Sequence, residues 1–299
     1  MYDIIIIGSG IAGLTSAIYA LNNKRKVLIL ESQTYGGQII NSNIINNYPG
    51  FLEISGFDLM TNIYNQVKNL GGVIKYEEVL EVTKNKKVIT KNETYEAKSI
   101  IISTGLAPRK LNLENEDKFI GKGISYCATC DGSFYKDKDV MVVGGGNTAI
   151  EDVIYLSNIC KKVYLVYRRK ELRKDVNLTE KVKRLSNVEI IYNSNIEKLN
   201  GDESLSSVDI INKDTEKITN IIIDGLFVAI GKIPSGNIFK DLLNVTENGY
   251  IITDEDCHTN IDGIYAAGDI RKKNLRQLVT AASDGAIAAI EAIKYINKK

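Results

Sequence analysis

The stretch YDIIIIGSGIAG occupies residues 2–13 and decides the fold. Its first half is a continuous apolar run, which is typical of a strand buried on both faces of a parallel sheet. The glycines that follow have the spacing of a tight turn into a helix whose N-terminus can hold a pyrophosphate. A second apolar strand is expected at residues 26–30, so the segment predicts a βαβ unit that binds a dinucleotide. The predicted contacts are Gly8, Ser9, Gly10, Ile11, Ala12 and Gly13.

The same order of strand, glycine turn and helix start recurs at residues 138–149, with the sequence KDVMVVGGGNTA. Another apolar strand follows at residues 162–166, at the same offset as in the first copy. A lone glycine fingerprint is weak evidence, but two complete βαβ patterns predict two dinucleotide sites. The fold class expected is α/β, with two Rossmann-like dinucleotide-binding domains. The loop contacts predicted in the second copy are Gly144, Gly146, Asn147 and Thr148.

The residue at the tip of the second strand distinguishes the two copies. Counting 23 residues from the first glycine gives Glu31 in the first copy and Tyr167 in the second. A carboxylate accepts hydrogen bonds from ribose hydroxyls and repels a 2′-phosphate, which suits FAD or NAD. Tyr167 is instead followed by Arg168, Arg169 and Arg173, and guanidinium groups bind phosphate. We therefore expect FAD at the first site and NADPH at the second; the alternative is that the arginines only solvate a helix face.

The other strands that end in glycine and proline predict that the first domain is discontinuous in sequence. Residues 99–108 and 225–234 are apolar strands that end in glycine and proline, and each could return the chain toward the other domain. Residues 264–269 form a further short strand before an alanine-rich helix at residues 278–296. We expect the FAD domain at residues 1–112 and 244–299 and the NADPH domain at residues 113–243. Linkers near residues 111–123 and 232–244 would then form a hinge.

Cys127 and Cys130 are separated by two residues and followed by Asp131. This spacing fits half a zinc site, a redox disulfide or chance. Zinc needs about four ligands, and no second CxxC is present, so we predict no metal and favour redox chemistry. Asp131 could exchange the proton that thiol chemistry requires, or it could only cap a helix. Cys160 and Cys257 stand alone and are expected to be buried as small apolar residues.

The composition of the chain limits the kinds of partner that we expect it to bind. The 38 Lys and Arg residues nearly balance the 37 Asp and Glu residues, which leaves no overall basic field for nucleic acid or acidic lipid. No apolar run approaches the length of a membrane span, and the sequence from Tyr2 shows no targeting segment. We therefore expect a cytoplasmic protein that binds neither nucleic acid nor membrane.

The combination of motifs resembles the low-molecular-weight, bacterial-type thioredoxin reductases, which are class II pyridine nucleotide-disulfide oxidoreductases. The likeness covers essentially the whole chain, and the motifs that carry it are GSGIAG at residues 8–13, GGQ at 36–38, NYPG at 47–50, CATCDG at 127–132, GGGNTA at 144–149, RR at 168–169, AGD at 267–269 and RQ at 276–277. The resemblance implies a homodimer with non-covalent FAD, in which electrons pass from NADPH through the flavin to the cysteine pair and then to thioredoxin or a similar redoxin.

The resemblance also implies roles for single residues. Cys130 would face the flavin, Cys127 would attack the partner disulfide, and Asp131 would be the acid. The family commonly has histidine where this chain has Tyr167; a tyrosine can still stack on the adenosine or hydrogen bond near it, so we expect NADPH binding to survive the change. The further FAD contacts expected are Gly36, Gly37, Gln38, Asn47, Thr104, Gly105, Gly268, Asp269, Arg276, Gln277 and Leu278.

Three alternatives remain open. The donor could be ferredoxin, although relatives of that kind lack the second fingerprint and its arginines. The acceptor could be another redoxin or a small disulfide. A protein of another class would bind flavin and report redox state without turnover. The cysteines precede the strand at residues 138–143 and should therefore travel with the second nucleotide site, so the family's rotation between two domain arrangements is expected here.

Overall fold

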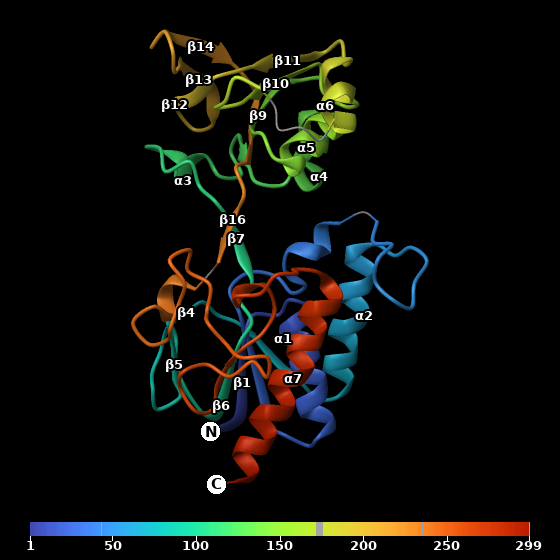
Figure 1. Cartoon of the computed structure of the whole chain (residues 1–299), viewed down its shortest axis with the longest axis vertical. Helices are drawn as coiled ribbons and strands as arrows, with labels where there is room; N and C mark the ends of the chain where they lie inside the picture. The colour runs from blue at the N-terminus through green and yellow to red at the C-terminus, as the bar shows by residue number, and fades with distance from the viewer. Residues whose placement is uncertain (43, 172–175, 235, 299) are drawn as a thin grey trace. The chain divides into compact units, whose positions relative to one another are not determined.

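The computed structural model describes residues 1–42, 44–171, 176–234 and 236–298. The chain divides into two compact units: unit 1 is Met1–Ala107 with Ile233–Lys299, and unit 2 is Pro108–Lys232. Figure 1 labels the elements of both. No helix in the described part of the chain combines the length and the apolar character that a bilayer span requires.

Unit 1 is built on a seven-stranded sheet. Its strand order is β3-β2-β1-β6-β5-β4, and β17 pairs with β6. The pairs among β3, β2, β1, β6 and β17 are parallel, whereas β4 and β5 form an antiparallel extension beside β6. The strands are β1 (Tyr2–Ile7), β2 (Val27–Glu31), β3 (Val73–Tyr76), β4 (Val79–Val82), β5 (Lys87–Thr90), β6 (Thr94–Ile102) and β17 (Ile264–Ala266).

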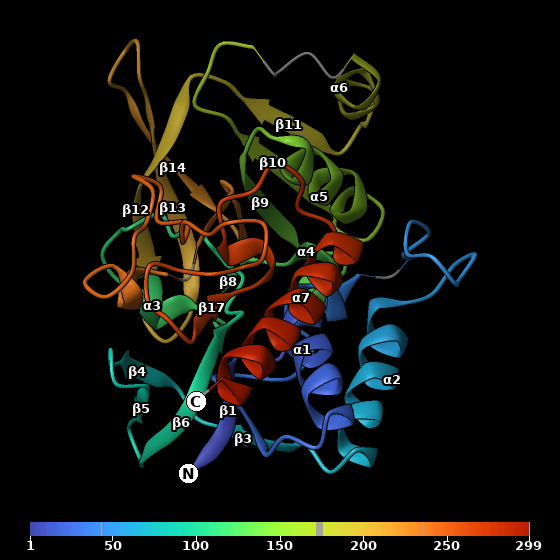
Figure 2. The same ribbon diagram turned by 60° about the horizontal axis from the view of Figure 1, so that its bottom comes forward.

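Helices cover one face of this sheet. The long helices α1 (Ile11–Asn22), α2 (Gly56–Asn69) and α7 (Leu278–Asn297) pack with Ile4 and Ile6 of β1 in one core cluster. Figures 1 and 2 both show α1 and α7 side by side, and Gly285 is what permits the approach, because a Cβ there would lie 2.2 Å from the carbonyl oxygen of Ala12. The short turns are η1 (Gly37–Asn41), η3 (Asn237–Phe239) and η4 (Gly268–Ile270).

Unit 2 has two sheets. A parallel sheet has the order β11-β10-β9-β15-β8, and an antiparallel sheet has the order β12-β13-β14. The strands are β8 (Ile124–Ser125), β9 (Asp139–Gly144), β10 (Lys162–Val166), β11 (Val188–Ile191), β12 (Ser194–Gly201), β13 (Leu205–Asn212), β14 (Ile218–Ile222) and β15 (Gly225–Ala229). The helical segments are α3 (Glu116–Phe119), α4 (Ala128–Asp131), η2 (Gly132–Tyr135), α5 (Asn147–Ser157) and α6 (Val176–Lys183).

The two faces of the parallel sheet in unit 2 bury different elements. Val140 and Val142 of β9 pack with residues of α5. Met141 and Val143, which alternate with them, pack with residues of β12 and β13. This alternation explains why the apolar run of the second fingerprint is continuous, since both faces of the strand are covered.

The unit boundaries differ from those predicted. The first junction lies at Ala107/Pro108 rather than after residue 112, and the second at Lys232/Ile233 rather than after residue 243. Phe239 and Leu243 are buried in the core of unit 1, which draws residues 233–243 into that unit. In unit 2 the backbone N–H of Leu111 donates to Glu116 Oε1 over 2.8 Å. The junctions themselves are carried by β7 (Leu106–Pro108) and β16 (Lys232–Pro234), which form a two-stranded sheet.

Candidate functional site

The glycine loop of unit 1 lies at the carboxyl end of β1. Gly8 has φ +101°, and a Cβ there would lie 2.5 Å from the carbonyl oxygen of Ser103. A Cβ on Gly13 would lie 2.0 Å from the carbonyl oxygen of Gly8. These two glycines therefore let α1 approach the sheet closely. Gly10, the N-cap of α1, would place a Cβ in open space, so the helix N-terminus is accessible to a ligand.

The middle residue of this loop is tied to the tip of β2. The backbone N–H and the hydroxyl of Ser9 both donate to Oε2 of Glu31 over 2.8 Å. The N–H of Gln33 donates to the other carboxylate oxygen over 3.1 Å. Ser9 is fully buried, whereas Glu31 is partly exposed. The carboxylate is thus held beside the glycine loop and stays partly exposed at the tip of β2.

Three parallel strands end together at this edge of the sheet. Ile7 of β1 and Ala266 of β17 both pair with Ile102 of β6, so the segments that follow these strands lie at one edge. β1 has β2 on one side and β6 on the other, which makes this edge a topological switch point. The predicted residues that directly follow the three strands at this edge are Gly8, Thr104, Gly105, Gly268 and Asp269.

The other residues predicted for this site are connected to one another. Gly36 donates to the carbonyl of Ser9 over 3.0 Å, and a Cβ on Gly37 would lie 3.3 Å from Gly10 Cα. The Gln38 amide donates to the carbonyl of Leu106.

The C-terminal contributors form a second group. Asn47 donates to Oε1 of Gln277 over 3.3 Å, and Gln277 is the N-cap of α7, which Leu278 begins. The Arg276 guanidinium lies 4.1 Å from the centroid of the Tyr250 ring. The N-termini of α1 and α7 therefore both carry predicted residues of the unit 1 site.

Sequence reasoning missed the buried ion cluster beneath this site. Asp284 on α7 accepts from the N–H of Gly268 over 3.0 Å, from Arg271 Nη1 over 2.8 Å and from Lys273 Nζ over 2.8 Å. All three charged side chains are about nine-tenths buried. The cluster fixes the turn that carries Gly268 and Asp269. An acidic residue in an otherwise alanine-rich helix was the one signal that could have revealed it.

The two single cysteines are buried, as expected. Arg271 Nη1 lies 3.1 Å from Cys257 Sγ, and burial raises the pKa of this thiol to about 12. Burial likewise raises the pKa of Cys160 to about 11. Both are therefore neutral thiols at physiological pH and poor nucleophiles.

The glycine loop of unit 2 repeats the arrangement at the end of β9. Gly144 has φ +150°, and a Cβ there would lie 2.3 Å from the carbonyl oxygen of Ala229 on β15. Gly146 is the N-cap of α5 and has no atom within 4 Å of its Cβ position. Asn147 and Thr148 are exposed on the first turn of α5. β9 lies between β10 and β15, so this loop too occupies a switch point.

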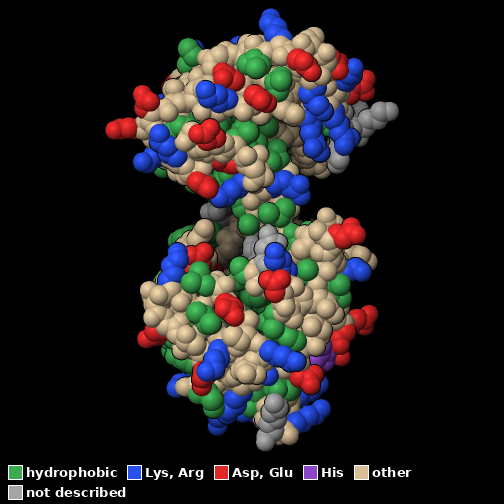
Figure 3. Space-filling model, turned by 90° about the vertical axis from the view of Figure 1, so that its left-hand side faces the viewer, with side chains coloured by type: hydrophobic (Ala, Val, Ile, Leu, Met, Phe, Trp, Pro, Cys, Tyr) green, Lys and Arg blue, Asp and Glu red, His purple; other side chains and the backbone are tan. Residues whose placement is uncertain are grey.

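Arg168 and Arg169 are exposed just beyond the end of β10. Within the described ranges no carboxylate pairs with either guanidinium, whereas the neighbouring Lys170 pairs with Asp214 at 2.8 Å. Figure 3 shows a group of Lys and Arg side chains at the right of this unit, with others scattered over the same face. Arg173 lies outside the described residues. The two described arginines are therefore free to bind an anion near the second loop.

Asp152 is a further residue that sequence reasoning missed. It lies on α5, and burial raises the pKa of its carboxyl to about 6; Glu151 adds to the shift and Lys232 opposes it.

Cys127 and Cys130 form a disulfide in unit 2. Cys127 is the N-cap of α4, and the N–H of Cys130 donates to its sulfur over 3.3 Å. Both residues are half-buried. The short strand β8 precedes them, which the sequence did not indicate. Among the described residues, no group of three or more His, Cys, Asp and Glu is placed to hold a metal ion.

Ser125 connects the disulfide to Asp131. Its hydroxyl donates to Asp131 Oδ2 over 2.6 Å, and its oxygen accepts from the N–H of Cys127 over 3.0 Å. The alternative that Asp131 only caps a helix is wrong, since Cys127 caps α4 and the Asp131 side chain makes no cap hydrogen bond to η2. The carboxylate is instead held beside the redox pair.

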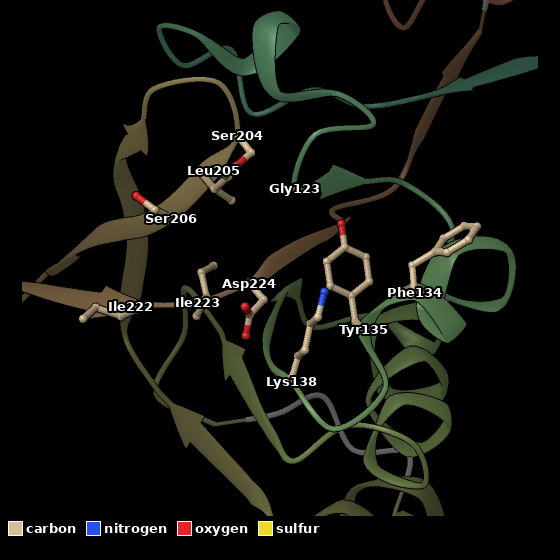
Figure 4. A pocket seen from close by; sticks show the side chains of 10 residues that line it. All are labelled: Gly123, Phe134, Tyr135, Lys138, Ser204, Leu205, Ser206, Ile222, Ile223 and Asp224. Atoms are coloured by element: carbon tan, nitrogen blue, oxygen red, sulfur yellow. The ribbon is translucent and has the colours of Figure 1, made fainter.

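A cavity of about 520 Å³ lies in unit 2 beside η2, the turn that follows the disulfide helix. Figure 4 shows Tyr135, Lys138 and Asp224 near its centre, with Phe134 and Ile222 at its sides. Phe134 is 73% exposed and Ile222 is 78% exposed, which places them among the most exposed large apolar side chains of the described residues. Burial raises the pKa of the Tyr135 hydroxyl, and Asp131 and Asp224 add to this shift, so the pocket wall is neutral at that point.

Known proteins resemble this chain along its whole length. The model of the pyridine nucleotide-disulphide oxidoreductase family matches residues 2–285. The thioredoxin reductase of Peptoclostridium acidaminophilum is 42% identical over 306 residues, covering 99% of this chain and 97% of that protein. Among solved structures, Lactococcus lactis thioredoxin reductase has a TM-score of 0.86 at 37% identity, with both chains fully covered. A ferredoxin-flavin thioredoxin reductase from Clostridium acetobutylicum has a TM-score of 0.55 at 33% identity, covering 100% of this chain and 99% of that one.

The buried cluster predicts a large and specific loss of stability. Asp284→Asn leaves Arg271 and Lys273 without their shared carboxylate, so we expect it to destabilise the folded protein by about 3–5 kcal/mol. Urea unfolding followed by circular dichroism measures the difference. The control is Glu96→Gln, which removes an exposed 3.0 Å pair with Lys87 and should cost under about 1 kcal/mol. Equal losses in the two variants would contradict the assignment.

Proposed function

The chain belongs to the thioredoxin reductases of the pyridine nucleotide-disulphide oxidoreductase family, and from that membership we propose that NADPH is its donor, FAD its flavin and a thioredoxin its acceptor. The observation that carries the proposal is the disulfide Cys127–Cys130, which shares a compact unit with one of two dinucleotide loops. A metal site or a sensor would not require a second loop of this kind.

The residues of unit 1 fit FAD. Gly10 leaves the N-terminus of α1 open to a pyrophosphate, and Glu31 offers a carboxylate to the adenosine ribose. Asn47, Asp269, Arg276 and the start of α7 would hold the rest of the cofactor. When bound, FAD supplies the two-electron chemistry that links a nicotinamide to a disulfide. The protein's part is to orient it and to hold the proton donors.

Asp131, the acid near the disulfide, is the proposed proton donor and acceptor in the exchange. Reduction of Cys127–Cys130 takes two electrons and two protons and yields two thiols. Cys127, as thiolate, would attack the acceptor's disulfide, and Cys130 would then displace the reduced acceptor and re-form the original bond. Asp131, held by Ser125 at 2.6 Å, is placed to take and return the proton in this exchange.

The arginines favour NADPH over the other donors. Arg168 and Arg169 are exposed, and within the described chain no carboxylate neutralises them, which suits a 2′-phosphate. The ferredoxin-flavin relative leaves ferredoxin as the competing donor. A complete glycine loop with two adjoining arginines has no role in that alternative, and we therefore prefer NADPH.

The acceptor pocket is the cavity beside η2. Its exposed apolar walls, Phe134 and Ile222, lie in the same unit as the disulfide, and Phe134 is four residues from Cys130. Exposed apolar surface of this kind marks contact with another protein. We propose that this cavity receives an apolar side chain that lies beside the redox cysteines of a thioredoxin. The proposal also includes a homodimer that works in the cytoplasm.

The donor assignment predicts a selective loss of affinity. Arg168→Ala and Arg169→Ala should each weaken NADPH binding about tenfold and leave NADH binding unchanged, because only NADPH carries the 2′-phosphate. The rate of flavin bleaching at varied NADPH, NADH and reduced ferredoxin measures this. If NADH bleached the flavin of the unaltered enzyme as fast as NADPH does, the assignment of the arginines would be wrong. Bleaching by reduced ferredoxin and by neither nucleotide would establish ferredoxin as the donor.

The pocket predicts a loss confined to the protein substrate. Phe134→Ala should raise the KM for thioredoxin about tenfold, because removing an interface aromatic typically costs over 1 kcal/mol. Reduction of a small aromatic disulfide should be unchanged. The control is Ile218→Ala, since Ile218 is 56% exposed on the same strand as Ile222 but does not line the cavity. If Phe134→Ala also slowed reduction of the small disulfide, or if Ile218→Ala raised the KM for thioredoxin equally, the docking role of the cavity would be contradicted.

A further inference from the structure

We propose that Tyr167 is a positioning residue that fixes the glycine loop of unit 2, and that it forms a matched pair with Gly145. This inference rests on the proposed binding of NADPH at that loop. Under this proposal the Tyr167 side chain packs on the backbone of the loop, and the arginines bind the 2′-phosphate of the adenosine.

The first observation is where the ring lies. Tyr167 is 4% exposed and belongs to the core of unit 2. A Cβ on Gly145 would lie 1.9 Å from Tyr167 Cε2, 2.1 Å from Cδ2 and 2.7 Å from Cζ. The ring therefore packs directly against the backbone of the loop's middle residue. So deeply buried a ring offers no exposed face on which an adenosine could stack.

The backbone of Tyr167 is also held firmly. Its N–H donates to the carbonyl of Ile191 over 2.9 Å, and its carbonyl accepts from the N–H of Ser194 over 3.1 Å. The residue is thus anchored to the end of β11 and the start of β12, and a ring anchored in this way is a rigid support for the loop that packs on it.

The second observation is the reason for glycine at each loop position. Gly144 needs positive φ and lies against Ala229, and Gly146 opens onto free space where a pyrophosphate could approach. Gly145 does not have positive φ, so backbone conformation does not require glycine there. The Tyr167 ring is what excludes a side chain at this position.

The third observation comes from unit 1, where the two equivalent positions are occupied differently. Ser9 takes the place of Gly145, and Glu31 takes the place of Tyr167; Glu31 and Tyr167 both lie 23 residues after the first glycine of their own loop. There the link is a pair of 2.8 Å hydrogen bonds instead of a packed ring. In both units, then, the strand tip immobilises the middle of the glycine loop, and the two residues must change together.

The pairing makes a prediction about nucleotide selectivity. The loop contacts the pyrophosphate, which NADPH and NADH share, so disturbing Tyr167 should weaken both nucleotides by the same factor. A residue that touched the 2′-phosphate would change their ratio instead. This separates the role of Tyr167 from that of its neighbours Arg168 and Arg169.

The test is a double-mutant cycle in the full-length holoenzyme with Gly145→Ala, Tyr167→Ala and the double variant. Dissociation constants for NADPH and NADH come from anaerobic nicotinamide fluorescence titrations of the fully reduced holoenzyme, whose flavin and disulfide cannot accept hydride, and melting temperatures are recorded in parallel. Gly145→Ala should weaken both nucleotides at least about tenfold, since a loop displaced by about 1 Å misplaces the phosphate. The double variant should recover most of this loss, because the smaller residue removes the clash. Tyr167→Phe keeps the ring and should bind both nucleotides as the unaltered enzyme does.

Two outcomes would overturn the inference. One is a changed NADPH to NADH ratio in Tyr167→Phe or Tyr167→Ala. The other is a double variant whose loss equals the product of the two single losses, which is the behaviour of independent sites. Failure of the unaltered enzyme to bind either nucleotide would instead contradict the proposed function, so the two failures are distinguishable.

Discussion

The structure depends on the close approach of a glycine backbone to the neighbouring strand at the carboxyl end of each parallel sheet. A Cβ on Gly8 would lie 2.5 Å from the Ser103 carbonyl oxygen, and one on Gly144 would lie 2.3 Å from that of Ala229. Only glycine permits both the positive φ and this approach. The turn then delivers a helix N-terminus to the point where the strand order reverses, which is where open α/β sheets bind ligands. The packing of the helix on the sheet and the position of each loop both depend on that contact.

The two units use this construction for different purposes. Unit 1 surrounds its loop with Glu31, the start of α7 and the buried Asp284 cluster, and these suit a large cofactor that stays bound. Unit 2 combines its loop with free arginines and the Cys127–Cys130 disulfide. Under the proposed function electrons must pass between units, and the chain crosses between them only at Ala107/Pro108 and Lys232/Ile233 in the division described. Two crossings are a natural hinge for the alternating arrangement that such a transfer requires.

Sequence patterns predicted the local elements well. The apolar run and glycines at residues 2–13 predicted β1 and α1, and the alanine-rich stretch predicted α7, because each pattern lies within one short stretch of sequence. Contacts distant in sequence were the ones missed. The boundary after residue 243 was wrong because Phe239 and Leu243 pack in unit 1, and Asp284 was missed because its partners Gly268 and Arg271 lie in another element. The Tyr167 ring on Gly145 depends on tertiary packing in the same way.

The central claim is that the disulfide Cys127–Cys130 is the only route from the flavin to a thioredoxin. Anaerobic stopped-flow absorbance of the flavin tests it most directly, with NADPH mixed first and oxidised thioredoxin second. In the unaltered enzyme the absorbance should bleach and then return. In Cys127→Ser it should bleach as before and stay bleached when thioredoxin is added, because no thiolate remains to attack the acceptor. Reoxidation of the Cys127→Ser flavin by thioredoxin at the unaltered rate would contradict the account.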